Sequence, residues 1–166
     1  MPKRENLNNG HLLFTSDDVM PHDLTPPTAD TSNQEPPKPG FTRHFRPSPF
    51  TAPWEPIWSK QVGDAIHMGI VAASPHCNSR GWVHGALLTA LADNAMGLSC
   101  ALGPVERQLV TVNLAIDFVA SARQGQWVEV QPSVIRTGAC LCFASALILA
   151  DGKPCARANG TFHVVD

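Results

Sequence analysis

Alternating apolar and polar residues predict long β-strands in the second half of the chain. Residues 109–121 alternate strictly, with apolar and polar side chains on opposite faces: Val110, Val112, Leu114, Ile116 and Phe118 against Thr111, Asn113, Asp117 and Ser121. A period of two is typical of a sheet with one buried face. Residues 126–136 alternate similarly, and the Asp151–Gly152 turn signal separates further strands expected at 140–150 and 154–165. The chain therefore ends in an antiparallel run.

The stretch before this run reads as a strand, a polar loop and one helix. Residues 65–73 follow the Gly63–Asp64 turn and predict a strand, whereas 74–83 are polar. Residues 84–102 have helical length and are apolar around nearly the whole circumference, which is typical of a helix that is buried in a large core or wrapped by another part of the structure. Because no second helix is available, we expect an α+β fold whose antiparallel sheet curls around this one long central helix.

The N-terminal quarter differs in composition from the rest. Residues 1–40 are rich in proline and acidic residues and poor in large apolar side chains, so burial cannot offset the entropy of ordering the backbone. We expect residues 1–40 to form a mobile arm and residues 41–166 to form the folded domain. The first part of that domain, 41–58, should pack along its surface through aromatic side chains: Phe41, Phe45, Phe50, Trp54 and Trp58.

Composition and charge narrow the choice of partners. Only 16% of the residues are charged, against roughly 25% in an average soluble domain, so another subunit is expected to cover part of the surface. The net charge of −2 provides no basic field for nucleic acid or anionic lipid. Asp93 in the middle of 84–102 argues against a membrane span, and no secretory signal is evident.

The cysteines suggest the compartment. There are five, an odd number without a C-x-x-C pair: Cys77, Cys100, Cys140, Cys142 and Cys155. This pattern favours reduced thiols over a disulfide framework, so we expect a soluble cytoplasmic protein.

Asp93 is the candidate for chemistry, because an ionised carboxylate without partners inside an apolar helix costs several kcal/mol. The simpler interpretation is that Asp93 lies on an exposed stripe or bonds Thr89 one turn back. A second candidate is Gly85, which can open the helix and leave its N–H free at the positive end of the helix dipole. Such an N–H can stabilise a developing oxyanion, although glycine also simply permits a tight entry into a helix.

The run HCNSRGWVHGALLTALADNAMG, residues 76–97, resembles the signature of the hotdog-fold acyl-CoA thioesterases. It is most similar to their phenylacetate-pathway and 4-hydroxybenzoyl-CoA thioesterase branch. The pattern N-x-x-G-x-x-H-G-G, followed by a helical Asp or Glu, is matched by five residues: Asn78, Gly81, His84, Gly85 and Asp93. Two positions depart from it, since Ala86 replaces the second glycine of the triplet and Ser121 stands where proline is common.

The resemblance implies a hotdog fold and hydrolysis of an acyl- or aryl-CoA thioester, in the setting of aromatic compound catabolism. It makes Asp93 the general base or the nucleophile and gives Gly85 N–H the task of polarising the thioester carbonyl. Asn78 would place the carbonyl or the water, and His84 would shape the site. Thr111 occupies the position of a hydroxyl near the carboxylate, although it could equally be an ordinary strand threonine.

The resemblance also implies where coenzyme A binds. It points to the end of one strand and to an arginine on the next: Phe118, Val119, Ala120, Ser121, Ala122, Arg123 and Arg136. Coenzyme A is part of the substrate, so no cofactor is expected. No metal is expected either, because His76, Cys77 and His84 lack a fourth ligand at zinc-like spacing.

Two other functions differ in what they require of the sequence. A hotdog dehydratase would carry its acid fourteen residues after the histidine of an H-F-P loop, but the residue at that distance from His76 is Ala90. A non-catalytic acyl-CoA-binding or sensing protein stays open as the alternative. For oligomerisation we expect a homodimer or a dimer of dimers, because Gly85 and Asp93 are about 12 Å apart along one helix and cannot reach the same carbonyl.

Overall fold

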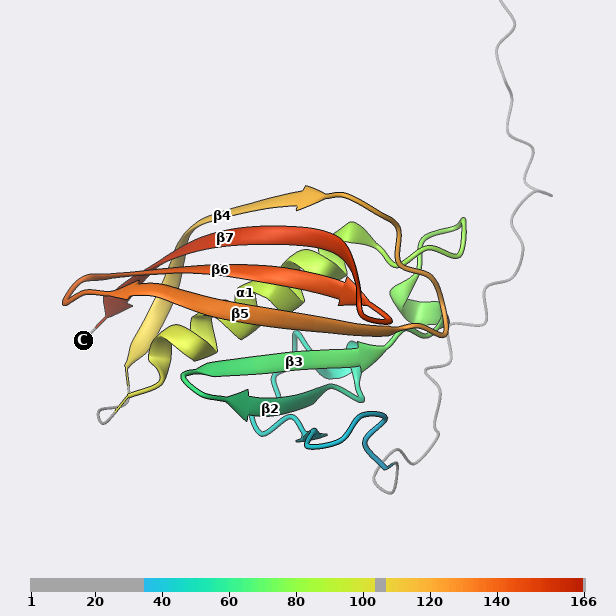
Figure 1. Ribbon diagram of the computed structural model, residues 1–166, viewed down its shortest axis with the longest axis horizontal. Helices are drawn as coiled ribbons and strands as arrows, with labels where there is room; N and C mark the ends of the chain where they lie inside the picture. Colours follow the sequence, from blue (N-terminus) through green and yellow to red (C-terminus); the bar gives the residue numbers. More distant parts are fainter. Residues whose placement is uncertain (1–34, 104–106, 166) are drawn as a thin grey trace, which may run out of the picture. The chain divides into compact units, whose positions relative to one another are not determined.

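The computed structural model describes residues 35–103 and 107–165, and from residue 65 onward its strands and long helix follow the expected order (Figure 1). They are β1 (Thr42–Arg43), η3 (Ala52–Trp54), β2 (Trp58–Val62), β3 (Ala65–Val71), η4 (Ser74–His76), α1 (Gly85–Ala101), β4 (Gln108–Phe118), β5 (Trp127–Thr137), β6 (Leu141–Ala150) and β7 (Lys153–Val165). The strands pair antiparallel in the order β1-β2-β3-β5-β6-β7-β4. The predicted α+β fold, a curled antiparallel sheet around one helix, is confirmed.

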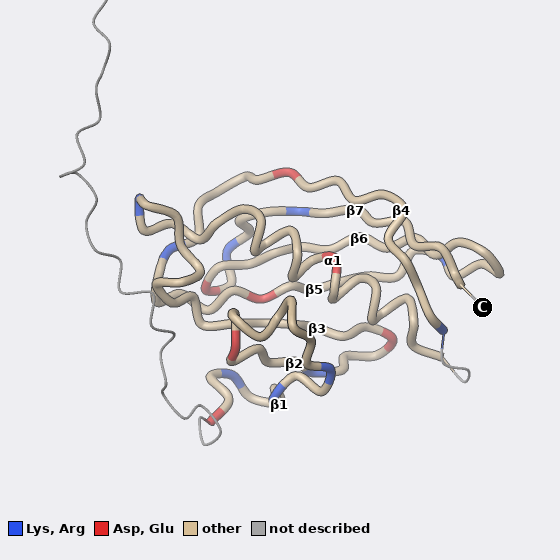
Figure 2. The backbone as a smooth tube through the Cα atoms, turned by 180° about the vertical axis from the view of Figure 1, so that it is seen from behind, with Lys and Arg blue, Asp and Glu red and all other residues tan. Residues whose placement is uncertain are grey.

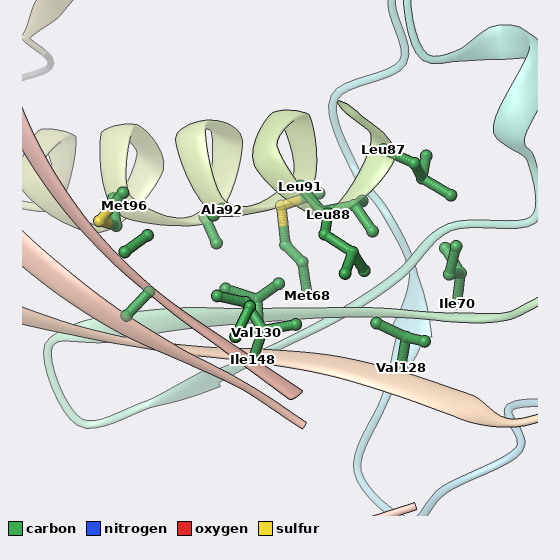
Figure 3. Close-up of a cluster of buried hydrophobic side chains, with 14 of the residues drawn as sticks. Met68, Ile70, Leu87, Leu88, Leu91, Ala92, Met96, Val128, Val130 and Ile148 are labelled. Atoms are coloured by element: carbon green, nitrogen blue, oxygen red, sulfur yellow. The ribbon is translucent and has the colours of Figure 1, made fainter. Parts of the chain in front are cut away.

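One side of α1 forms the core with the concave face of the sheet. Figure 3 shows Leu91 and Met96 on the side of the helix that faces Met68, Val130 and Ile148 of the strands, and all five are at most 1% exposed. Full burial of such a side chain contributes about 1.5–3 kcal/mol, so packing holds the helix along its length. Within residues 35–103 and 107–165, no helix is long and apolar enough to cross a membrane.

The opposite side of α1 is only partly covered by the sheet, through side chains such as Phe118 of β4. Residues on this side are half-buried or exposed: Gly85, Ala86, Thr89, Ala90, Asp93, Asn94, Gly97 and Leu98. Most of them are small. The apolar circumference of the sequence therefore combines two surfaces, a bulky one packed on the strands and a small-residue one left open. We call the second surface the open face of α1.

Strand β4 departs from strict alternation. Its register with β7 shifts between Thr111 and Asn113, so one extra residue, Val112, is inserted in the strand. A bulge reverses which side chains face the helix. Leu109 and Leu114 pack against the core on the same side, whereas Val110 and Val112 are 50% and 60% exposed. The prediction that Val110 and Val112 share a buried face with Leu114 is wrong for this reason.

The aromatic segment 41–58 is partly inside the domain. Phe41 and Trp58 are buried at 2% exposure, and Phe41 packs edge-on against Trp127 with ring centroids 5.0 Å apart. Phe45 and Phe50 remain on the surface, both 64% exposed. This segment therefore packs on the domain as expected, with Phe41 and Trp58 buried beside Trp127. Of the arm expected at 1–40, all but residues 35–40 lies outside the described residues.

The thiols are not all reduced. Cys100 at the end of α1 and Cys142 on β6 form a disulfide, with Cα atoms 6.1 Å apart, whereas Cys77, Cys140 and Cys155 are free. The expectation of reduced thiols throughout is thus contradicted. The two partners are separated by 42 residues, and only the packing of the helix end against β6 brings them together.

Candidate active site

The start of α1 leaves a backbone donor unused. His84 is the residue that caps the helix, and its Nδ1 accepts a hydrogen bond from Ala86 N–H at 3.1 Å. Within the described residues, no acceptor pairs with Gly85 N–H. The ring of Phe118 lies over Gly85, so that a Cβ at this position would be 2.9 Å from the ring. Gly85 N–H is therefore a free donor at the positive end of the helix dipole, suited to a carbonyl oxygen.

Asn78 holds the loop that leads into the helix. Its Oδ1 accepts hydrogen bonds from the N–H groups of Arg80 and Trp82 at 2.9 and 3.3 Å. Its carbonyl oxygen accepts from Gly81 N–H at 2.9 Å, in a turn where Gly81 has a φ of +74°. These bonds commit the acceptor of the Asn78 side chain to the loop and leave its NH₂ group as a possible donor. The role of Asn78 toward a substrate stays a prediction.

Asp93 is the sole charged residue of α1, and Figure 2 shows this acidic position on an otherwise uncharged helix. Its Oδ1 accepts a hydrogen bond from Thr111 Oγ1 at 2.8 Å. Thr89 does not bond Asp93, because its hydroxyl donates to the carbonyl of Gly85 at 2.9 Å. Among the described residues, nothing donates to Asp93 Oδ2. The carboxylate is therefore fixed through one oxygen and available through the other.

Thr111 reaches Asp93 because of the bulge in β4. Without the extra residue Val112, the side chain of Thr111 would lie on the opposite face of the sheet from Leu114. With the bulge, both face α1, and the hydroxyl meets the carboxylate. An ordinary strand threonine would not need this contact, so the geometry favours the role in the site.

Two clefts of different chemistry meet at Asp93 and Thr111. The larger, about 590 Å³, extends toward the C-terminal end of α1 and is lined by His44, Arg46 and Arg107 in addition to helix and strand residues. The smaller, about 450 Å³, extends toward the N-terminal end and has an apolar lining that is shared by three elements: Phe50, Ala86, Ala90 and Leu114. Segment 44–50 therefore borders the site on both sides of Asp93.

Sequence reasoning missed segment 44–50 and Arg107 as site residues. The aromatic residues of 41–58 did indicate packing on the domain, but nothing in their spacing identified the open face of α1 as the surface they contact. Arg107 directly precedes β4, and its guanidinium donates to the carbonyl of Gly138 at 3.2 Å. That contact lies 31 residues away in the chain and has no local signal.

The residues expected to hold coenzyme A do not gather in one place within the chain. Val119 and Ala120 donate their N–H groups to the carbonyl of Cys155, and Ala122 is buried with its carbonyl accepting from Val83 N–H. Ser121 and Arg123 are exposed beside them. This group, together with Phe118, lies near the start of α1.

Arg136 lies apart from that group. Arg136 on β5 pairs with Phe143 of β6, on the convex face of the sheet. Phe118 on β4 pairs with a residue of β7 that in turn pairs with Ile148 of β6, so Phe118 lies level with Ile148. Phe143 and Ile148 are five residues apart on β6, which is about 17 Å along the strand. One chain thus does not bring Arg136 to Phe118–Arg123.

His76 has a structural place in the loop. Its Nδ1 accepts a hydrogen bond from Ala73 N–H at 2.9 Å, and the residue is 5% exposed. Burial lowers the pKa of His76, partly offset by hydrogen bonds to the backbone of Trp54 and Val71. Within the described part of the chain, no three His, Cys, Asp or Glu side chains cluster in a way that could hold a metal ion.

Comparison with known proteins gives consistent matches. The family model of the thioesterase superfamily matches residues 80–154. A Pseudomonas aeruginosa protein named "Putative esterase PA0474" is 38% identical over 129 residues, covering 75% of this chain and 95% of that protein. A hypothetical thioesterase protein with coenzyme A from Streptococcus pneumoniae TIGR4 shares the fold, with a TM-score of 0.62 at 18% identity over 68% of this chain and 90% of that chain. A phenylacetic acid degradation-related protein from Ralstonia eutropha JMP134 has a TM-score of 0.62 at 24% identity over 72% of this chain and 92% of that chain.

Proposed function

The chain belongs to the thioesterase superfamily, as its motif at 76–97 predicted, and we propose that it hydrolyses acyl- or aryl-CoA thioesters to the free acid and coenzyme A. The observation that carries this proposal is the carboxylate of Asp93. It is oriented by Thr111, has a free oxygen and stands where two clefts meet. The Streptococcus thioesterase, whose structure was solved with coenzyme A, supports this class of substrate.

The geometry suits attack by water. Asp93 Oδ2 accepts a proton from a water molecule, whose oxygen forms a bond to the thioester carbonyl carbon. The carbonyl oxygen takes up negative charge and is stabilised by the N–H of a Gly85. The C–S bond then breaks, and the coenzyme leaves as a thiolate that takes up the proton held by Asp93, which restores the carboxylate. Direct attack by Asp93 Oδ2 on the carbonyl carbon uses the same orientation and differs in forming an anhydride that water later opens.

Helix geometry supports a homodimer with shared sites. Gly85 is the first residue of α1, and Asp93 lies eight residues later, about 12 Å along the axis. Reacting groups must approach one carbon to roughly 3–3.5 Å. Two copies of α1, antiparallel across a two-fold axis through their open faces, would bring Gly85 of one protomer to Asp93 of the other and form two equivalent sites.

A second interface would extend the dimer to a dimer of dimers. The convex face of the sheet exposes large apolar side chains that are unusual for a free surface: Ile135, Leu141, Phe143 and Leu147. Large exposed apolar side chains favour a subunit contact here, although Arg136 and Arg157 pair with Phe143 and Leu147 on the same face. It also agrees with the low charge content of the chain.

The activity is tested by thiol release from a panel of short-chain, medium-chain and aryl CoA thioesters, with the Asp93→Asn variant as the inactive control. We expect turnover of at least one class by the natural chain. Binding of acyl-CoA by calorimetry without any thiol release would instead establish the acyl-CoA-sensing alternative.

Shared sites are tested by mixing two inactive variants, Asp93→Asn and Gly85→Pro. Proline is well tolerated at the first position of a helix and removes the N–H. Because a Cβ at Gly85 would be 2.9 Å from the ring of Phe118, that exposed side chain must move aside, and circular dichroism of Gly85→Pro checks that the fold is kept. Random exchange of subunits should restore about a quarter of the natural activity, since half of the dimers then contain one intact site. A fully active monomer in sedimentation would contradict the shared site.

A further inference from the structure

The two clefts at Asp93 differ in chemistry in the same way as the two ends of a CoA thioester. One end of such a substrate is an acyl group, and the other carries the phosphates of the coenzyme. The apolar cleft of Phe50, Ala86, Ala90 and Leu114 contains no charged side chain other than Asp93. The larger cleft contains two arginines and a histidine, and Asp93 is again its sole acidic residue. We name them the acyl slot and the cationic cleft.

Segment 44–54, which contributes to both clefts, is held in place by its own hydrogen bonds. The backbone N–H of Ser48 donates to the hydroxyl of Thr51 at 3.1 Å, and the N–H of Thr51 donates to the hydroxyl of Ser48 at 3.2 Å. Thr51 is buried, at 3% exposure. Phe50 packs edge-on against Trp54, with ring centroids 4.6 Å apart. Phe50 is thereby presented to the acyl slot on a constrained turn, as a wall residue of defined position.

The cationic cleft has unused capacity for an anion. Within the described residues, no carboxylate pairs with Arg46 or Arg107, and Arg107 uses one of its donors on the carbonyl of Gly138. His44 Nδ1 is buried and has no hydrogen-bond partner in the described part of the chain. Guanidinium groups bind phosphate by two parallel hydrogen bonds, and two of them in one cleft favour an anionic ligand.

We propose that, in the dimer, a thioester substrate lies between the two open faces and spans Asp93, with its acyl group against Phe50 in the acyl slot and the phosphate-bearing end of coenzyme A at Arg46 and Arg107 in the cationic cleft. This assignment rests on the proposed function and deepens it. It makes Phe50 the residue that sets the size of the acyl group. It also gives the coenzyme two ligands that the resemblance did not include.

The coenzyme end is tested with two carriers of the same uncharged acyl group. One is the CoA thioester, and the other is the N-acetylcysteamine thioester, which lacks phosphates. Arg46→Ala with Arg107→Ala should raise KM for the CoA thioester about 10-fold or more and leave KM for the short thioester unchanged. Lys153→Ala, which removes an exposed cation outside both clefts, is the matched control. Equal changes for both carriers, or no change, would overturn the assignment of the phosphates.

The acyl end is tested by the ratio of kcat/KM for a large and a small acyl group on coenzyme A. Phe50→Ala should shift this ratio about 10-fold toward the large group, and Phe50→Trp should shift it the opposite way. Phe45→Ala is the control, because Phe45 lies in the same segment with the same exposure, 64%, and lines neither cleft. An unchanged ratio in both Phe50 variants would rule out the acyl slot.

These outcomes separate the inference from the proposed function. If the natural chain hydrolyses no thioester, the proposed function fails. If it does and the variants match their controls, the orientation alone is wrong.

Discussion

Asp93 and Glu129 are two carboxylates on opposite sides of the sheet, and their hydrogen bonding differs strongly. Glu129 on β5 is 9% exposed. Its carboxylate oxygens bond to the side chains of Trp127, Gln131 and His67 at 3.0–3.1 Å. The ammonium group of Lys60 lies 3.8 Å away. Asp93 accepts a single bond, from Thr111, and borders open clefts.

The difference shows which carboxylate can do chemistry. Burial raises the pKa of Glu129, but the bonds from Trp127, Gln131 and His67, with the charge of Lys60, outweigh it and hold the pKa below its usual value. Taking up a proton there would disrupt several donors at once. Asp93 has an oxygen free to accept a proton from water and only one bond that orients it. This difference favours Asp93 as the proposed base and Glu129 as a group that serves stability.

The largest expected effect is that of Asp93→Asn on turnover. Loss of a positioned base should lower kcat about 10²–10⁴-fold. Because the amide can still accept the hydrogen bond from Thr111, the melting temperature should stay close to that of the natural chain. Thiol release and thermal unfolding are measured on the same sample, and near-natural turnover would show that Asp93 is structural.

Glu129→Ala should have the opposite profile. It leaves the buried indole N–H of Trp127 without its acceptor, which costs about 1–3 kcal/mol of unfolding free energy. The kcat of the folded protein should be unchanged, because Glu129 faces away from α1. Urea unfolding measures the first effect, and Glu129→Gln, which restores an acceptor, is the control. A large loss of kcat in folded Glu129→Ala would break the division of roles.

Thr111→Ala is expected to have an intermediate effect on activity. Removing one hydrogen bond to a charged carboxylate, worth about 1.5–3 kcal/mol, loosens that group and should lower kcat about 10-fold or more. Thr111→Ser keeps the hydroxyl and should retain most of the activity. If both variants lose activity equally, the methyl group of Thr111 matters rather than its bond to Asp93.

The smallest expected effect is on the pH dependence of stability. The folded pKa of Glu129 is below its unfolded value, so the unfolded chain binds the proton more readily. Its stabilising contribution is therefore complete above the ordinary glutamate pKa and is lost as the pH falls through the folded pKa. Urea unfolding between pH 7 and 3 should show this loss, and Glu129→Gln should reduce its slope. An identical slope in the variant would mean that other groups dominate.

Local sequence patterns determined the order of the elements and the position of the principal candidate. Each of these patterns involves only residues that are close in the chain, and backbone geometry links each to one kind of element. Strict alternation predicts a strand, the Asp151–Gly152 turn a hairpin, and the apolar run 84–102 a helix. A lone carboxylate in that helix is also a local fact. So is the glycine that follows His84 at its start.

Only the tertiary structure decided what surrounds Asp93. The bulge at Val112 turns Thr111 toward the helix, because the partner strand β7 sets the register. The open face of α1 exists because the sheet covers one side of the helix, and segment 44–54 borders that face through contacts distant in the chain. Arg136 on the convex face and the Cys100–Cys142 disulfide depend on long-range pairing in the same way. Such contacts arise from packing between distant segments, and the local sequence of one segment does not identify the other.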